Sequence, residues 1–275
     1  MLESSVREEI AGILAEADLE QKLARAEALT ARADAIGAAP ASSDGSHTPV
    51  RAEPPARPGH FRLLAPHEVP ERAKLGSAAG RYALMHSVAN IEFSAIELAL
   101  LTAADFPGEP AEFHREWLGV AGEEVCHARM VLARLRALGG EFGDLPVHLG
   151  LWDTAHRFTR VDERLAIVPR ILEARGLDVS ARLRDQLHRA GDHESADLLE
   201  VIYRDEIGHV AAGTRWLRAV CARDGVDPEV RFLELLDRFR RERGSRPTPI
   251  DREGRARAGF SERELAALEG RSDLQ

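Results

Sequence analysis

Two copies of a short pattern, Glu-x-x-His, hold the residues of this chain that are best suited to chemistry. Glu124 and His127 form the first copy, and Glu206 and His209 form the second. On an α-helix, side chains three positions apart share one face and lie about one turn from each other. A carboxylate and an imidazole arranged in this way can bind one metal ion together. The repeated pattern therefore indicates a metal site.

A lone glutamate precedes each copy at almost the same distance. Glu92 lies 32 residues before Glu124, and Glu173 lies 33 residues before Glu206. If each pair of segments forms an antiparallel helical hairpin, the lone carboxylate comes level with the pair on the partner helix. Glu92 also lies within an apolar stripe, where burying an unpaired charge is costly and a partner is required. Glu173 lies at the edge of its stripe, four residues after Pro169, so its assignment depends mostly on the spacing.

The six side chains together define the metals that we expect. Four carboxylates and two neutral imidazoles carry a charge of −4, which two divalent cations neutralise. Mixed carboxylate and imidazole ligation suits iron or manganese, although it does not exclude zinc. Metal-bound histidines usually donate their other ring N–H to a carboxylate. We therefore expect Glu123 and Asp205, each directly before a paired glutamate, to accept these hydrogen bonds, each from the histidine of the opposite hairpin.

The elements that must position these residues are helices. Apolar side chains recur at helical spacing over long stretches, and no segment shows a sustained alternation with a period of two. Boundaries follow from local signals, such as Asp192 before one helix, Asp227-Pro228 before another, and the capping box that begins at Ser261. The pattern predicts an all-α protein with helices over residues 78–104, 111–138, 153–174, 181–190, 193–222 and 227–242, and a short last helix after Ser261.

Composition divides the chain into four segments. Residues 1–36 contain no proline and predict a helical N-terminal segment. Residues 37–76 include stretches rich in proline and glycine, which are typical of an arm or linker. Residues 77–225 contain all the candidate ligands and predict a four-helix bundle, and residues 226–275 predict a C-terminal helical extension. The N-terminal helix and the arm are candidates for contacts between the subunits of a homo-oligomer.

The bulk properties favour a soluble cytoplasmic protein. The formal net charge of −9 disfavours general nucleic-acid binding, because phosphate contacts need clustered lysine and arginine. Two cysteines, Cys126 and Cys221, indicate no disulfide framework and fit a reducing compartment. The first residues lack the basic and then apolar pattern of a signal peptide. No apolar run approaches the ~18 residues that a membrane span requires.

Several runs of the chain resemble an uncharacterised bacterial ferritin-like family. They are residues 80–92 (GRYALMHSVANIE), 95–100 (AIELAL), 169–178 (PRILEARGLD), 190–193 (AGDH) and 204–210 (RDEIGHV). The resemblance covers about residues 55–260 and implies a ferritin-like fold with the six ligands named above. The family is similar, more distantly, to tRNA-modifying di-iron hydroxylases. A histidine often stands in the family where this chain has Asn90, so no role is carried over to that face. The resemblance implies a site and not a substrate.

The leading functional hypothesis is a di-iron oxidoreductase that activates O₂ to oxidise or hydroxylate an organic substrate. It requires a small-molecule substrate and an electron donor, neither of which the sequence identifies. One alternative is a ferroxidase or a peroxide-scavenging protein. Another is a non-catalytic bundle in which the metals only stabilise the fold. A nucleic-acid-modifying role is a further alternative, which the acidic balance weakens.

Three other side chains have two interpretations each. Tyr203 lies one turn before Glu206 and is either a redox-active or hydrogen-bonding residue beside the metals or, as we expect, a core tyrosine with a satisfied hydroxyl. Arg170 lies near the Glu173 face and is a candidate partner for a ligand carboxylate or for a substrate anion. Cys126 adjoins His127 but points away from the ligand stripe, and we expect a buried, inert thiol.

Overall fold

All regular secondary structure in the described part of the protein is helical. The structure, a computed structural model, describes residues 2–37, 53–244 and 247–271. Within these residues the one strand-like feature is an isolated bridge between Leu63 and Val147. The predicted all-α class is therefore confirmed. The chain divides into two compact units, Met1–Arg157 and Phe158–Gln275, which we call the first and second units.

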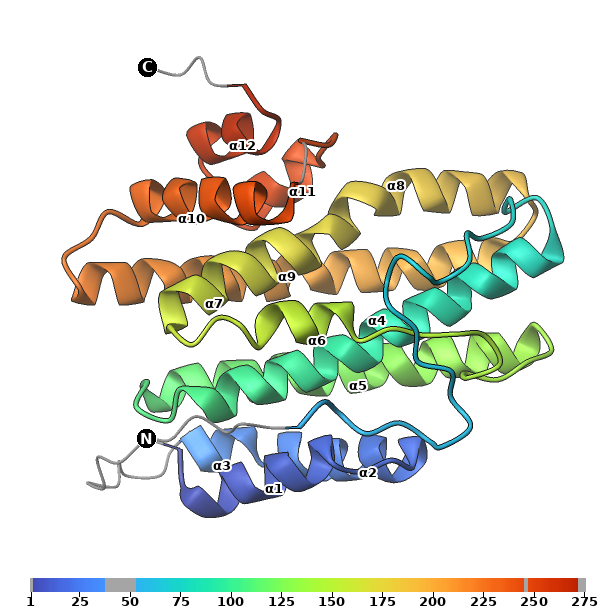
Figure 1. Cartoon of the computed structure of the whole chain (residues 1–275), viewed down its shortest axis with the longest axis horizontal. Coiled ribbons are helices and arrows are strands. Elements are labelled where there is room, and N and C mark those ends of the chain that lie inside the picture. Colours follow the sequence, from blue (N-terminus) through green and yellow to red (C-terminus); the bar gives the residue numbers. More distant parts are fainter. Residues whose placement is uncertain (1, 38–52, 245–246, 272–275) are drawn as a thin grey trace. The chain divides into compact units, whose positions relative to one another are not determined.

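The first unit is built on two long helices, α4 (Ala78–Asp105) and α5 (Ala111–Ala137), which pack along each other (Figure 1). Ser77 begins α4 by accepting a hydrogen bond from the N–H of Gly80. The short connection 106–110 makes the two helices antiparallel neighbours. From Leu84 to Ala104 almost every side chain of α4 is buried, which explains why this helix is apolar around its whole circumference.

Three N-terminal helices pack on this pair: α1 (Ser4–Leu14) against α4, and α2 (Leu19–Thr30) and α3 (Ala33–Gly37) against α5. A buried ion cluster joins α2 and residue 57 to α4. Glu97 accepts a hydrogen bond from Lys22 Nζ at 2.7 Å and two from the guanidinium of Arg57, at 2.5 and 2.8 Å. Two cations therefore compensate this buried carboxylate, and the charges of both hold the pKa of Glu97 below its usual value although burial alone would raise it.

The loop after α5 is fastened to α4 by a histidine. His86 Nε2 accepts hydrogen bonds from the N–H groups of Gly143 and Leu145, at 2.9 and 3.2 Å. Burial lowers the pKa of His86 to about 4, so the ring is neutral and can act as this acceptor. The loop leads into α6 (Gly150–Ala155), which packs against α4.

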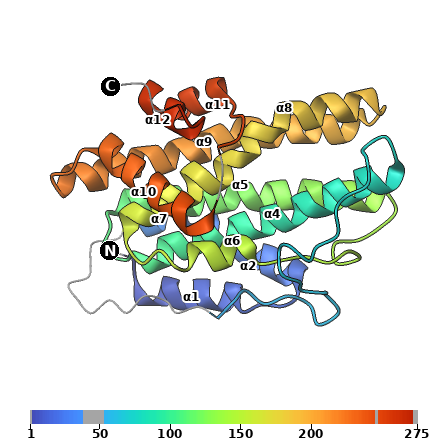
Figure 2. The same ribbon diagram turned by 45° about the horizontal axis from the view of Figure 1, so that its top comes forward.

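The second unit contains a long helix with a change of winding in its middle. α7 (Val161–Ile167), the π-helical segment η1 (Val168–Glu173) and α8 (Ala174–Arg189) follow one another without a break, and α9 (His193–Arg223) packs against all three (Figure 2). The chain then forms α10 (Pro228–Arg243), α11 (Arg252–Arg257) and α12 (Glu262–Leu268). α10 packs on α7 and α9, α11 packs on α8 and α9, and α12 packs on α10 and α11.

Most of the predicted helix boundaries are confirmed, but the third helix is not. Helices 78–104, 111–138, 193–222 and 227–242 agree with α4, α5, α9 and α10 to within one residue at each end. The prediction of a helix over 153–174 followed by a separate one over 181–190 is wrong. The structure has a short α6 and then a helix that runs from Val161 to Arg189. Pro169 is accommodated by the π segment, and Gly176 costs only about 1 kcal/mol inside a helix, which packing can offset.

Two sequence-based expectations meet the structure only in part. Part of the predicted arm 37–76, residues 38–52, lies outside the described residues, as do residue 1 and residues 245–246 and 272–275 of the terminal segments. In the described part, α4 is long and apolar enough to cross a membrane, contrary to our reading of the apolar runs, but its most apolar window is 89% buried. Such burial is consistent with the core helix of a soluble protein.

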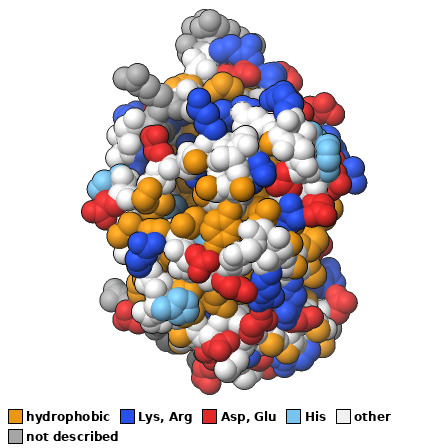
Figure 3. Space-filling model, turned by 90° about the vertical axis from the view of Figure 1, so that its right-hand side faces the viewer, with side chains coloured by type: hydrophobic (Ala, Val, Ile, Leu, Met, Phe, Trp, Pro, Cys, Tyr) orange, Lys and Arg blue, Asp and Glu red, His pale blue; other side chains and the backbone are white. Residues whose placement is uncertain are grey.

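On the face in Figure 3, acidic and basic side chains are interspersed.

Candidate metal centre

One set of candidate ligands converges in the first unit. Glu92 comes from α4, and Glu124 and His127 come from adjacent turns of α5. His127 Nδ1 lies 3.2 Å from Glu124 Oε2 and 3.4 Å from Glu92 Oε2. The ligand atoms of the three side chains all lie within 4.8 Å of one another, and each residue is at most 2% exposed. The antiparallel pairing of α4 and α5 thus brings a lone glutamate level with a Glu-x-x-His pair.

The electrostatics of this set indicate a shortage of positive charge. Burial raises the pKa of Glu92 to about 8, and the nearby carboxylate of Glu124 acts in the same direction. Burial would lower the pKa of His127, but hydrogen bonds to Glu124 and Glu92 and their charges outweigh it and raise that pKa to about 11. Without a metal, the set therefore holds protons that solvated Glu and His side chains would release at neutral pH. A divalent cation can replace those protons.

The donor set fits a metal ion. Glu92 Oε2 is buried, and its contact with His127 Nδ1 is long, at 3.4 Å, so this oxygen remains able to bind a cation. Carboxylate oxygens and an imidazole nitrogen are ligands that iron, manganese and zinc accept. Glu97, on the same helix and equally buried, has Lys22 and Arg57 as partners instead. The two glutamates of α4 therefore differ in what balances their charge.

The second unit holds the other pair on one helix. Glu206 and His209 are buried on α9, 7% and 2% exposed, with Glu206 Oε2 3.8 Å from His209 Nδ1. Glu173 is the last residue of η1 and is half-buried. It belongs to no group of three close ligand atoms in the described part of the chain. The structure thus brings Glu206 and His209 together, whereas the place of Glu173 is given by the position of its helix.

The packing of η1 on α9 fixes the register of Glu173. A Cβ added to Gly213 would lie 2.4 Å from Pro169 Cγ, so these two residues are in close contact. The tight turn 190–192 makes the two helices antiparallel. Glu173 lies four residues after Pro169, and His209 lies four residues before Gly213. Counting one helical turn from the contact on each side places Glu173 level with His209.

Arg170 has a partner that the sequence did not suggest. Its guanidinium donates to Glu264 Oε2 at 2.7 Å and to Thr214 Oγ1 at 3.1 Å, and it lies between the rings of Phe232 and Phe260. The expected pairing with a ligand carboxylate or a substrate anion is therefore wrong. Glu264 lies 91 residues after Glu173 in the chain, and no local sequence pattern connects the two.

The remaining candidates have ordinary surroundings. Tyr203 donates its hydroxyl to Asp251 at 2.7 Å, so the expected satisfied hydroxyl is confirmed, but the side chain is half-buried and not in the core; burial raises its pKa to about 12. Cys126 is exposed, so the expected buried thiol is wrong; on α5 it lies on the exposed side with Glu123, whereas Glu124 and His127 are buried. Glu123 is exposed and Asp205 is half-buried. Their expected role as acceptors of the imidazole N–H stays a prediction.

Two polar features of the first unit were not found in the sequence. Asn90 donates to the carbonyl of His148 at 3.1 Å, while its buried Oδ1 has no hydrogen bond within the described residues. Lys22 and Arg57, the partners of Glu97, lie 75 and 40 residues before it in the chain. The only sequence signal for this ion cluster is therefore a charged residue within an apolar helix.

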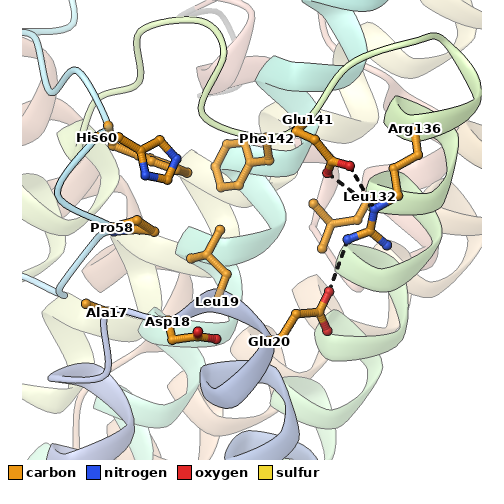
Figure 4. A pocket seen from close by; sticks show the side chains of 11 residues that line it. Ala17, Asp18, Leu19, Glu20, Pro58, His60, Leu132, Arg136, Glu141 and Phe142 are labelled. Atoms are coloured by element: carbon orange, nitrogen blue, oxygen red, sulfur yellow. Dashed lines mark hydrogen bonds and ion pairs between the residues drawn. The ribbon is translucent and has the colours of Figure 1, made fainter.

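A hollow of about 460 Å³ also lies in the first unit, beside the start of α2, residues 58–61, α5 and residues 141–142 (Figure 4). None of the candidate ligands lines it. Arg136 pairs with both Glu20 and Glu141 at its edge, and Asp18 accepts the N–H of Gln21 as the cap of α2. This hollow is therefore no part of the candidate metal centre.

The fold and the site define an all-helical protein with buried sets of glutamate and histidine. The chain belongs to the DUF455 family, described as a protein of unknown function, whose model matches residues 15–266. It is also similar to an uncharacterized protein of Haemophilus influenzae, with 38% identity over 213 residues that cover 74% of this chain and 72% of that protein. No solved structure matches the chain.

Proposed function

We propose that this protein is a dinuclear-metal oxidoreductase that uses O₂ to oxidise or hydroxylate an organic small molecule. The observation that carries the proposal is the buried set of Glu92, Glu124 and His127. Carboxylates buried side by side are costly unless a proton or a cation lies between them. Iron is the metal that we propose, with manganese as the alternative that suits the same ligands.

We further propose that both sets serve one centre. The ligands are then Glu92, Glu124 and His127 from the first unit and Glu173, Glu206 and His209 from the second, within a ferritin-like four-helix bundle formed by residues 77–225. A lone glutamate on each of two helices and a Glu-x-x-His pair on each of two others is the ligand pattern of di-iron and di-manganese carboxylate bundles. The matched spacings of 32 and 33 residues and the register of Glu173 with His209 support this arrangement.

Iron ions bound at such a centre supply electrons and open coordination positions for O₂ chemistry. The chain's own residues hold the ligands and exclude water: α4 is buried along most of its length, and His127 is 1% exposed. Metal uptake displaces the protons that Glu92 and His127 hold in the metal-free protein, so binding is expected to release protons. Glu123 and Asp205 would orient the imidazoles by accepting their ring N–H groups.

Hydroxylation also sets requirements on partners. The balanced reaction, R–H + O₂ + 2 e⁻ + 2 H⁺ → R–OH + H₂O, needs two electrons beyond those in the substrate. An external electron donor is therefore part of the proposal. An oxidation that removes two hydrogens from the substrate supplies its own electrons and, with O₂ as the acceptor, needs no donor. The distant resemblance to tRNA-modifying hydroxylases identifies no substrate for this chain.

The test is metal content, optical spectrum and O₂ uptake of full-length protein from iron-supplemented cells. We expect about two metal ions per chain, following the ligand pattern, and O₂ consumption by the ferrous protein. Glu124→Ala and Glu206→Ala should each lose metal, whereas Glu112→Gln, at an exposed position of α5, should not. Protein that binds no metal and consumes no O₂ would overturn the proposal.

The same experiments separate the alternatives. Iron loading or peroxide turnover without an organic substrate would indicate a ferroxidase or a peroxide-scavenging protein. Loss of stability in Glu206→Ala, together with no redox turnover in the wild type, would indicate a structural metal site. Binding of tRNA at moderate salt would revive a nucleic-acid-modifying role.

A further inference from the structure

The π-helical segment that ends at Glu173 is held by the C-terminal helices. In an α-helix the N–H of Ala174 bonds the carbonyl of Arg170, four residues earlier. Here the N–H of Ala174 bonds the carbonyl of Pro169 instead, five residues earlier. The change of winding therefore displaces the carbonyl of Arg170 from its usual partner.

Arg255 of α11 supplies a donor to that carbonyl. Its guanidinium donates to the main-chain oxygen of Arg170 at 3.0 Å, and it donates to both carboxylate oxygens of Asp178, at 2.8 and 2.7 Å. Arg170 lies three residues before Glu173 and Asp178 lies five after it. One buried side chain, 2% exposed, thus contacts the helix on both sides of Glu173, once within η1 and once in α8.

Further contacts hold the two residues that Arg255 binds, Arg170 and Asp178. The side chain of Arg170 lies between the rings of Phe232 and Phe260, 4.1 and 4.2 Å from their centroids, and pairs with Glu264 of α12. Asp178 also accepts the N–H of Asp251, the residue that caps α11. The C-terminal helices therefore hold the main chain and the side chain of the same residue of η1. A π turn is less favourable than an α turn, so it persists only where tertiary contacts enforce it.

We propose that Arg255 is a positioning residue for Glu173, and that α11 and α12 serve the metal centre by enforcing the winding that sets the direction of this ligand. The proposal rests on the proposed function, because it assigns Glu173 as a ligand. If the segment returned to α-helical winding, Glu173 would turn relative to α9. We expect this change of winding to weaken metal binding while the segment stays helical.

The test compares metal affinity in the full-length chain and uses Mn²⁺ or anaerobic Fe²⁺ as the probe. Arg255→Lys keeps the charge but cannot reach the carbonyl and both carboxylate oxygens together. It should weaken metal binding by about 10–100-fold, the range for residues that orient metal ligands. The matched control is Arg240→Lys, because Arg240 also donates to two carbonyls of the C-terminal helices, those of Ala267 and Leu268, but does not touch η1. It should lower the melting temperature and leave the affinity unchanged.

A double-mutant comparison shows whether Arg255 acts through Glu173. In a Glu173→Ala background, Arg255→Lys should not weaken metal binding further. An equal weakening in both backgrounds, or wild-type affinity in Arg255→Lys, would overturn the positioning role and leave the proposed function standing. A wild-type protein that binds no metal would overturn the proposed function and, with it, the positioning role. Amide hydrogen exchange over residues 168–178 of the metal-free variants would still report whether Arg255 holds the segment.

Discussion

Glu92 and Glu97 provide a matched pair of substitutions, because both are buried carboxylates on α4 and only Glu97 is paired with a lysine and an arginine. Replacing Glu97 by glutamine keeps the shape and removes the charge. Lys22 and Arg57 then remain buried without a counter-charge, and breaking a buried pair in this way costs about 3–5 kcal/mol. We expect Glu97→Gln to lower the free energy of unfolding by that amount.

Glu92→Gln should have the opposite sign in the metal-free protein. Since burial raises the pKa of Glu92 to about 8, folding disfavours its ionised form. The protonated Glu92 side chain therefore contributes fully to stability below its pKa in the unfolded chain, about 4.5. This contribution is lost as the pH rises towards 8, its pKa in the folded protein. Glutamine carries no such penalty, so metal-free Glu92→Gln should be at least as stable as the wild type at pH 8, with the advantage disappearing near pH 5.

The assay is urea unfolding of chelator-treated protein at pH 5 and pH 8, followed by far-UV circular dichroism and repeated with Mn²⁺. Metal should stabilise the wild type and Glu97→Gln, and it should stabilise Glu92→Gln much less. The reasoning would be refuted if Glu92→Gln destabilised the metal-free protein as much as Glu97→Gln does. It would also fail if Mn²⁺ stabilised Glu92→Gln as strongly as the wild type.

Three further predictions follow from single contacts. Gly213→Ala should destabilise the protein by about 1–3 kcal/mol, because the new Cβ would lie 2.4 Å from the ring of Pro169; an unchanged denaturation midpoint would contradict this close packing. Tyr203→Phe should cost about 1 kcal/mol by removing the bond to Asp251 and leave metal content and O₂ uptake unchanged; lost turnover would instead indicate a redox role. Because the pKa of His86 is lowered to about 4, stability should fall as the pH drops from 6.5 to 4, and this part of the fall should be absent from melts of His86→Gln.

The long helices were predictable because their signals are local. Ser77 and Asp192 cap α4 and α9 through their own side chains, and the apolar stripes of these helices extend over many turns. The convergence of Glu92 with Glu124 and His127 followed from two helices joined by a short connection. The sequence could indicate this set because one hairpin contains all of it.

The rest depends on partners that are distant in the chain. The predicted third helix ended at residue 174, before Gly176, whereas the helix continues to Arg189 as η1 and α8, which pack on α9. Arg170 lies near Glu173 in the sequence, but its guanidinium is bound by Glu264, 94 residues further along the chain. Cys126 was expected to be buried because free thiols usually are, but its side chain is exposed on α5.

The π segment also sets the helical phase of the residues that follow it in the second unit. It contains one residue more than an α-helix of the same rise needs, so the side chains before Val168 and after Glu173 follow two different helical phases. Deleting a single residue between them would let the segment take up α-helical winding with nearly the same rise and rotation, so the helix on both sides would keep its orientation while the π turn that ends at Glu173 is lost. A single-residue deletion should therefore disturb the packing of the second unit less here than in α9, where it would rotate everything downstream by about 100°, and its main effect here should fall on Glu173.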